Sequence, residues 1–107
     1  MMDILPSDRC ETMAEVRAAV DQTDRDLVAL LARRFGYMDA AARIKPDRDT
    51  VRDEARKAQV IDNVCGQARA AGLPEMLIAG IWETLVEGSI AYELDRFDTL
   101  RAEPSAR

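Results

Sequence analysis

Two cations, Arg34 and Lys45, share the apolar face of one helical stretch, where hydrophobic side chains are expected. At 100° per residue and with Val16 set to 0°, the apolar residues Val20, Leu27 and Met38 fall between roughly 20° and 40°. On the same scale Arg34 falls at about 0° and Lys45 at about 20°. Each has an ordinary explanation, because Arg34 could pair with an acid across a helix interface and Lys45 could extend its ammonium to water. Two cations on one line are also what one wall of an anion-binding site requires.

Two later helical stretches also carry polar side chains on their apolar faces. In the second stretch, Asp53 and Arg56 fall within about 40° of the apolar line, and Lys57 within about 60°. In the third, Ser89 and Glu93 are one turn apart on the side of the apolar residues. A buried carboxylate on that face must pair with a cation or take up a proton, because burial disfavours its charged form.

Together these side chains predict a small polar cavity inside a helical bundle, rich in cations. Its members are Arg34, Lys45, Asp53, Arg56, Ser89 and Glu93. Planar arginine forks beside a lysine suit a ligand with two carboxylates or phosphates. Arg17 is a further candidate, but it lies about 25 Å along the same helix from Arg34 and is turned by about 100°, so it could reach only the site of a neighbouring chain.

The helix that carries Arg34 is long for a chain of this size. A capping box of Thr12 and Glu15 begins it, and it ends before Pro46. A helix of residues 13–44 is roughly 48 Å long, whereas a globular chain of this size has a radius of gyration of only about 13 Å. Two shorter helices cannot cover its apolar stripe, so the sequence predicts a homodimer in which the long helices pack together. The alternative is a long helix exposed to solvent.

Two shorter helices follow the long one. A second capping signal at residues 50–53 begins a helix that stops at Gly72, and Pro74 suits the first turn of the third helix. The predicted buried spine of the third helix is Ile78, Ile81, Trp82, Leu85, Ile90 and Leu100. Because strand-like alternation is lacking, the predicted fold class is all-α, with one long and two shorter helices per chain.

The length of 107 residues allows one domain with a modest core. We expect a flexible N-terminus over 1–11, a helical domain over 12–101 and a disordered tail over 102–107. The first ten residues carry acids and a proline instead of the basic end and apolar run of a signal peptide, and no segment approaches membrane-spanning length. Cys10 and Cys65 lack a CxxC or Cys/His pattern, so we expect free thiols, no metal and a cytoplasmic location.

Composition excludes several classes of function. Fifteen Lys and Arg against twenty Asp and Glu leave a net charge of −5, the wrong sign for a protein that holds nucleic acid by neutralising phosphates. The chain contains no histidine, which excludes Ser-His and Cys-His nucleophile systems and removes the commonest nitrogen ligand for metals. Any chemistry must therefore use carboxylates, cations and hydroxyls.

Four segments in order resemble the all-helical, bacterial type II chorismate mutases, a family that includes the related isochorismate-pyruvate lyases. They are EVRAAVDQTDRDLVALLARR, ARIK, VRDEAR and GSIAYE, and the resemblance covers about residues 12–100. It implies an intertwined all-α homodimer with two equivalent active sites, conversion of chorismate to prephenate in phenylalanine and tyrosine biosynthesis, and no cofactor.

The resemblance also implies a role for each candidate residue. Arg17 enters the partner's site, and Asp53 and Ser89 match positions that line the pocket. The cations that hold the substrate's carboxylates and ether oxygen are Arg34, Lys45 and Arg56. The side chain at position 93 donates to the ether oxygen from the side opposite the lysine.

The implied reaction suits a chain without histidine. It is an intramolecular Claisen rearrangement that needs no nucleophile or metal. The enzyme holds the dianion in a compact conformer and stabilises the negative charge that develops on the ether oxygen as its C–O bond breaks.

Position 93 departs from one common pattern of the family. It is Glu93 here, whereas many bacterial members carry Gln and some fungal ones carry Glu. An ionised carboxylate cannot donate a hydrogen bond, so Glu93 must be protonated to act, which burial favours and Lys45 opposes. We therefore expect activity to rise toward acid pH, and Glu93→Gln to extend it to neutral and alkaline pH.

Position 57 is the second departure. The usual mutase motif has Glu after the arginine that matches Arg56, where it is expected to contact the ring hydroxyl of the substrate. Lys57 stays a candidate substrate-binding residue but cannot accept that hydrogen bond. The similar isochorismate-pyruvate lyases lack this glutamate, so elimination of pyruvate from isochorismate, forming salicylate, is the first alternative. Those lyases keep Gln at the position of Glu93, whereas Asp53 and Arg56 in VRDEAR favour the mutase.

The second alternative is a non-catalytic helical dimer that binds an aromatic-pathway metabolite or activates a partner enzyme. Lys57 and Glu93 are the features that favour it. The sequence leaves open an association with another shikimate-pathway enzyme, and it predicts neither a nucleic-acid nor a membrane partner.

Overall fold

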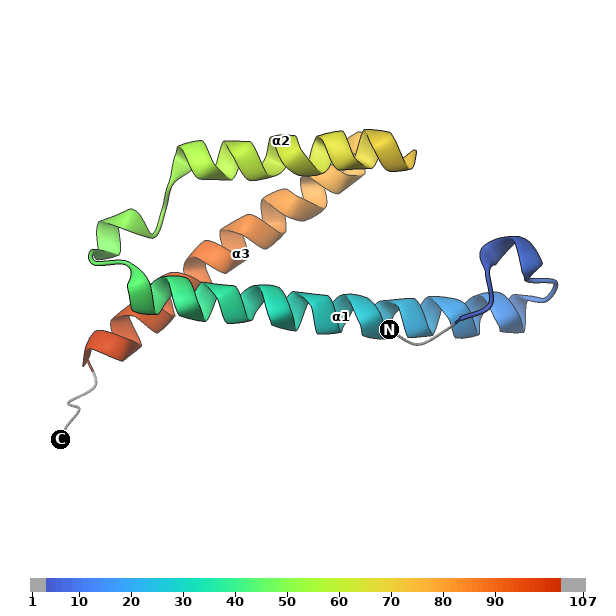
Figure 1. The fold of residues 1–107 in the computed structure, drawn as a ribbon, viewed down its shortest axis with the longest axis horizontal. Helices are drawn as coiled ribbons and strands as arrows, with labels where there is room; N and C mark the ends of the chain where they lie inside the picture. The colour runs from blue at the N-terminus through green and yellow to red at the C-terminus, as the bar shows by residue number, and fades with distance from the viewer. Residues whose placement is uncertain (1–3, 103–107) are drawn as a thin grey trace. The chain divides into compact units, whose positions relative to one another are not determined.

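The computed structural model describes residues 4–102. All regular structure in this range is helical and no strand is present there, which confirms the predicted all-α fold class (Figure 1). The helices are α1 (Met13–Ile44), α2 (Glu54–Ala71) and α3 (Glu75–Ala102), with short 3-10 helices η1 (Ser7–Arg9) and η2 (Arg48–Thr50). The chain divides into two compact units, residues 1–37 and 38–107. The predicted disordered tail falls outside the described residues except for Ala102, and the predicted flexible N-terminus does so at residues 1–3.

The capping box at the start of α1 is confirmed. The Thr12 hydroxyl accepts a hydrogen bond from the Glu15 amide at 3.1 Å, and the Glu15 carboxylate accepts from the amides of Thr12 and Glu11 at 3.0 and 2.8 Å. These contacts satisfy N–H groups that have no partner inside the helix. Because the amides of Glu11 and Thr12 stabilise the ionised carboxylate, they lower the pKa of Glu15.

The apolar stripe predicted along α1 is open in the first unit. Three residues of the predicted stripe, Val20, Leu27 and Leu31, are 51%, 52% and 39% exposed. An exposed apolar surface of this extent is typical of an interface and untypical of a solvent-facing helix.

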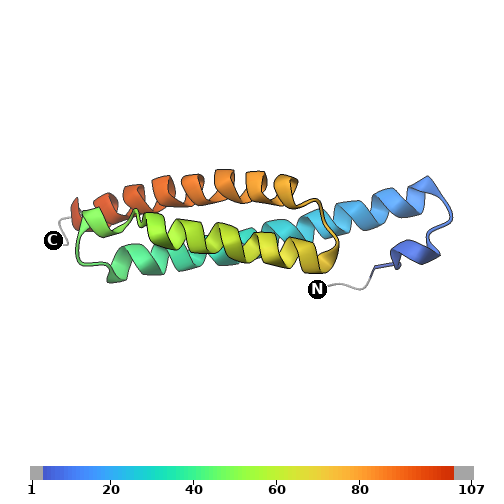
Figure 2. The ribbon, with the colours of Figure 1, turned by 90° about the horizontal axis from the view of Figure 1, so that it is seen from above.

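A left-handed glycine ends α2 as predicted. Gly72 has a φ of 72°, and its amide donates to the carbonyl of Arg69 at 3.2 Å, while the amide of Leu73 donates to that of Ala68 at 2.9 Å. This Schellman motif satisfies carbonyls at the helix end, and only glycine takes the left-handed conformation without strain. α3 begins directly after Pro74, and it returns alongside α2 in the opposite direction (Figures 1 and 2).

α2 begins later than predicted. Its N-cap is Asp53, whose carboxylate accepts a hydrogen bond from the Arg56 amide at 3.0 Å. Thr50 instead ends η2, where its hydroxyl donates to the carbonyl of Asp47 at 2.6 Å. Thr50 and Asp53 both have side chains that can cap a helix. Because the Thr50 hydroxyl is bonded at the 3-10 helix, Asp53 caps α2, which starts at Glu54.

The core of the second unit joins the end of α1, the segment after η2 and α3. Ala42, Val51 and Phe97 are buried there, with Ile90 and Leu94 packed against them. The end of α1 and the segment just before α2 therefore both pack against α3.

The buried line of α3 differs from the predicted spine. It consists of Val86, Ser89, Glu93 and Phe97. The prediction was wrong for Ile81 and Leu100, which are 47% and 37% exposed. Ile81 points about 160° away from Phe97, and Leu100 lies in the last turn of the helix. Half of the buried line is polar, so apolar packing alone does not account for it.

Candidate active site

The centre of the candidate site is an ion pair between Lys45 and Glu93. Lys45 Nζ lies 2.8 Å from Glu93 Oε2, and the two side chains are 29% and 5% exposed. Lys45 continues the last turn of α1, because its amide donates to the carbonyl of Ala41 at 2.9 Å. The sequence predicted that both residues lie on buried faces, and the structure brings them into contact.

The contacts around this pair leave the Glu93 carboxylate able to accept a further hydrogen bond. Lys45 Nζ donates to the carbonyl of Val51 at 3.3 Å, which directs the ammonium toward α3. Glu93 Oε2 is enclosed and meets the charge of Lys45, yet within residues 4–102 it accepts no aligned hydrogen bond. Buried carboxylate oxygens are normally satisfied by directional donors, so this oxygen marks a place where another group can bind.

Ser89 lies one turn before Glu93 on the same buried line. It is 3% exposed, and its hydroxyl donates to the carbonyl of Leu85 at 2.7 Å. A pocket-lining role for Ser89 stays a prediction.

The predicted residues of α2 lie at its exposed first turn. The carboxylate of Asp53 caps the helix, and the Arg56 guanidinium donates to Gln59 at 2.6 Å. Both side chains are exposed in the single chain, and the contacts that hold them are local to α2. Sequence analysis placed Asp53 beside the apolar line but did not identify it as the cap.

Lys57 belongs to a group of charges that we call the α2–α3 ion cluster. Its members are Arg52, Glu54, Lys57, Glu83 and Glu87. Lys57 Nζ lies 2.7 Å from Glu83 and from Glu87, and Arg52 lies 2.7 Å from Glu87. Hydrogen bonds from Arg52 and Lys57 lower the pKa of Glu87 to about 2, and the two carboxylates raise the pKa of Lys57. The cluster fastens the start of α2 to α3.

Arg17 and Arg34 both belong to the first unit. Arg17 is exposed and Arg34 is half-buried, and the role of Arg17 in a neighbouring chain's site stays a prediction.

Sequence analysis missed the polar contacts at the end of α1. Asp39 accepts a hydrogen bond from the Tyr92 hydroxyl at 2.7 Å and pairs with Arg96 Nε at 3.2 Å. Because a proton on the hydroxyl stabilises the neighbouring carboxylate, Asp39 raises the pKa of Tyr92. Arg101 donates to two carbonyls of the last α1 turn. The sequence feature that could have indicated these contacts is Pro46. Proline has no N–H, so a carbonyl of that turn needs a donor from elsewhere.

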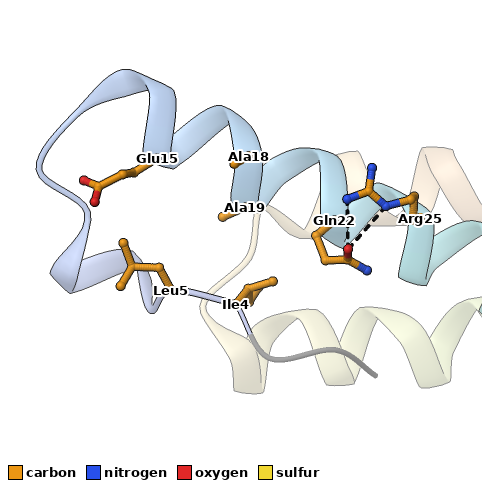
Figure 3. Close-up of a pocket in the computed structure, with 7 residues that line it drawn as sticks. All are labelled: Ile4, Leu5, Glu15, Ala18, Ala19, Gln22 and Arg25. Carbon is orange, nitrogen blue, oxygen red and sulfur yellow. Dashed lines mark hydrogen bonds between the residues drawn. The ribbon is translucent and has the colours of Figure 1, made fainter.

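A hollow in the first unit has a different character. Ile4 and Leu5 lie beside the first turns of α1 and border a space of about 300 Å³ (Figure 3). Gln22 is 8% exposed there, and its Oε1 accepts hydrogen bonds from Arg25 at 2.8 and 3.3 Å. These polar groups are already paired, so the hollow offers mainly apolar walls.

Two features are absent from the described residues. Between residues 4 and 102, no helix has the length and apolar character needed to cross a membrane. The same range holds no group of three or more acidic or cysteine side chains placed to bind a metal ion. Cys10 and Cys65 are free, as expected.

Comparison with known proteins gives two results. The family model described as chorismate mutase type II matches residues 16–94, a range that contains every predicted site residue. The isochorismate pyruvate lyase of Pseudomonas aeruginosa is 29% identical over 85 residues, which make up 79% of this chain and 84% of that protein.

Proposed function

The chain belongs to the chorismate mutase type II family, and from this membership we propose that it catalyses the rearrangement of chorismate to prephenate. The observation that carries the proposal is the Lys45–Glu93 pair, in which an ammonium meets an enclosed carboxylate whose Oε2 accepts no aligned hydrogen bond within the described residues. In the reaction the ether C–O bond breaks as a C–C bond forms within the same molecule, so the protein has only to hold the substrate and stabilise charge.

The proposed chemistry assigns separate tasks to the two side chains. The ether oxygen takes the position between them, where Lys45 donates to it from the end of α1. Glu93 donates from α3 once it has taken up a proton, because only the protonated form is a donor. The Val51 carbonyl keeps the ammonium in place before the substrate arrives, so little reorganisation is needed in the transition state.

The remaining polar residues form the proposed clamp for the two carboxylates of the substrate. They are Arg34, Asp53, Arg56, Ser89 and, from a second copy of the chain, Arg17. Planar guanidinium groups suit carboxylates, because each can donate two parallel hydrogen bonds.

A homodimer is part of the proposal. Its support is the open apolar stripe of α1, where Val20 and Leu27 remain more than half exposed and Leu31 is 39% exposed in the single chain. A second copy that covers the stripe also delivers Arg17 to the neighbouring site, so each site is complete only in the dimer.

Elimination of pyruvate from isochorismate is the second candidate. The relative from P. aeruginosa favours it, and so does Lys57, whose ammonium cannot accept a hydrogen bond from a ring hydroxyl. Lys57 is also engaged with Glu83 and Glu87, and this contact gives it a structural role.

The test is a paired turnover assay with the purified protein. We expect loss of chorismate with formation of prephenate, a turnover lowered at least about 100-fold in Lys45→Ala and retained in Arg48→Ala, which removes only an exposed ion pair with Asp98. Salicylate and pyruvate formed from isochorismate, without conversion of chorismate, would establish the lyase instead. Turnover of neither substrate by an intact dimer would contradict both and favour the non-catalytic binding protein.

A further inference from the structure

We infer that Arg101 is a positioning residue for Lys45, an inference that rests on the proposed function. Its guanidinium lies at the end of α1, where Nη1 donates to the carbonyl of Ala42 and Nη2 to the carbonyl of Lys45, both at 2.7 Å. These contacts hold the backbone from which the Lys45 side chain extends toward Glu93. Arg101 therefore acts on the site through Lys45 and not through the substrate.

Pro46 creates the need for this contact. In an α-helix, the carbonyl of residue 42 accepts a hydrogen bond from the amide of residue 46, and proline has no N–H to donate. Ala42 is 0% exposed, so water cannot readily take the place of the missing donor. Arg101 supplies it from 59 residues further along the chain, and its positive charge suits the negative end of the helix dipole.

The guanidinium is itself held by the core. Its Cζ atom lies 3.7 Å from the centre of the Phe97 ring, and Phe97 packs with Ala42 and Val51. The Val51 carbonyl in turn accepts from Lys45 Nζ. One core cluster thus fixes Lys45 at both ends, the backbone through Arg101 and the ammonium through Val51.

The first experiment measures turnover of chorismate. We expect Arg101→Gln to lower kcat about tenfold with KM changed less than about twofold, because a displaced donor weakens transition-state stabilisation more than ground-state binding. Arg48→Gln, which removes an exposed arginine that contacts α3, is the matched control and keeps the wild-type kcat. In a Lys45→Ala background Arg101→Gln causes no further loss, because it acts only through that lysine. A loss of the same size in both backgrounds overturns the inference.

The second experiment does not depend on turnover. Hydrogen exchange of the Lys45 amide, which donates to the carbonyl of Ala41, reports whether the last turn of α1 is closed. We expect this exchange to be about tenfold faster in Arg101→Gln while exchange in α2 is unchanged. Adding Pro46→Ala restores a donor for Ala42 and returns the exchange and kcat toward wild type.

The outcomes separate the two proposals. Unchanged exchange at Lys45, or no recovery with Pro46→Ala, overturns the role of Arg101. A wild-type protein that does not convert chorismate counts against the proposed function, and the exchange measurement still decides whether Arg101 holds the end of α1.

Discussion

Two lysine–glutamate contacts on α3 have nearly the same length and very different surroundings. Lys45 and Glu93 lie 2.8 Å apart, with the carboxylate 5% exposed and no aligned hydrogen bond to its nearer oxygen within the described residues. Lys57 and Glu87 lie 2.7 Å apart in the α2–α3 ion cluster, where the carboxylate is 39% exposed and a second cation, Arg52, also donates to it. The distance therefore does not indicate the role of the pair.

Satisfaction of the carboxylate separates the two pairs. In the cluster, Glu87 accepts hydrogen bonds from two cations, so it can fasten two helices but has little capacity left for a ligand. Glu93 is enclosed and pairs with Lys45, and within the described residues its Oε2 accepts no aligned hydrogen bond, so a further donor can stabilise it. On this comparison the first pair is the candidate for chemistry, whereas the second fastens two helices.

The largest expected effect separates the two lysines. Lys45→Ala should lower kcat/KM for chorismate by a factor of at least about 100, because a donor to the developing oxyanion is lost. Lys57→Ala should change kcat/KM less than about threefold, since its ammonium is engaged by Glu83 and Glu87. Steady-state kinetics on both variants checks this, and an equal loss at Lys57 would break the comparison by making that residue part of the substrate site.

The second effect concerns pH and separates the two glutamates. Wild-type activity should rise as pH falls, because Glu93 donates only when protonated, and Glu93→Gln should keep activity up to neutral and alkaline pH with a gain of about tenfold there. Glu87→Gln, the matched change in the α2–α3 ion cluster, should leave the shape of the profile unchanged. A flat wild-type profile, or an inactive Glu93→Gln, would contradict the assignment.

The smallest effect is on stability. Hydrogen bonds from Arg52 and Lys57 lower the pKa of Glu87 from 4.5 to about 2, so its ionised form stabilises the fold above pH 4.5 and this contribution is lost as pH falls toward 2. Glu87→Gln should therefore lower Tm by a few degrees at neutral pH, and the difference should shrink across that interval. Thermal melts at several pH values test this, with Asp98→Asn as the control for an exposed pair. A difference that stays constant with pH would show that packing, not charge, causes it.

Local rules predicted most helix ends, because the deciding contacts are close in sequence. The Thr12–Glu15 box and Gly72 each act within a few residues. The same rules misplaced the start of α2, since Thr50 and Asp53 are both capping residues and only the folded chain shows which one caps the α-helix.

Helical phase predicted that Lys45 and Glu93 lie on buried faces, because it detects polar side chains on apolar faces. It could not predict that Glu83 and Glu87 would hold Lys57, since those carboxylates are ordinary exposed charges of α3. Nor could it find Arg101, whose partner carbonyls lie 56 and 59 residues away along the chain.

Val51 connects packing with chemistry in a way that limits engineering of this protein. Its side chain is 4% exposed in the core, and its carbonyl holds the Lys45 ammonium. A residue that fills the core better at position 51 also moves that carbonyl, so selection for thermal tolerance and selection for turnover act on the same few atoms. Shortening the connection between α1 and α2, a common route to sturdier helical proteins, carries the same conflict. Variants intended to stabilise the chain are best sought elsewhere in the fold.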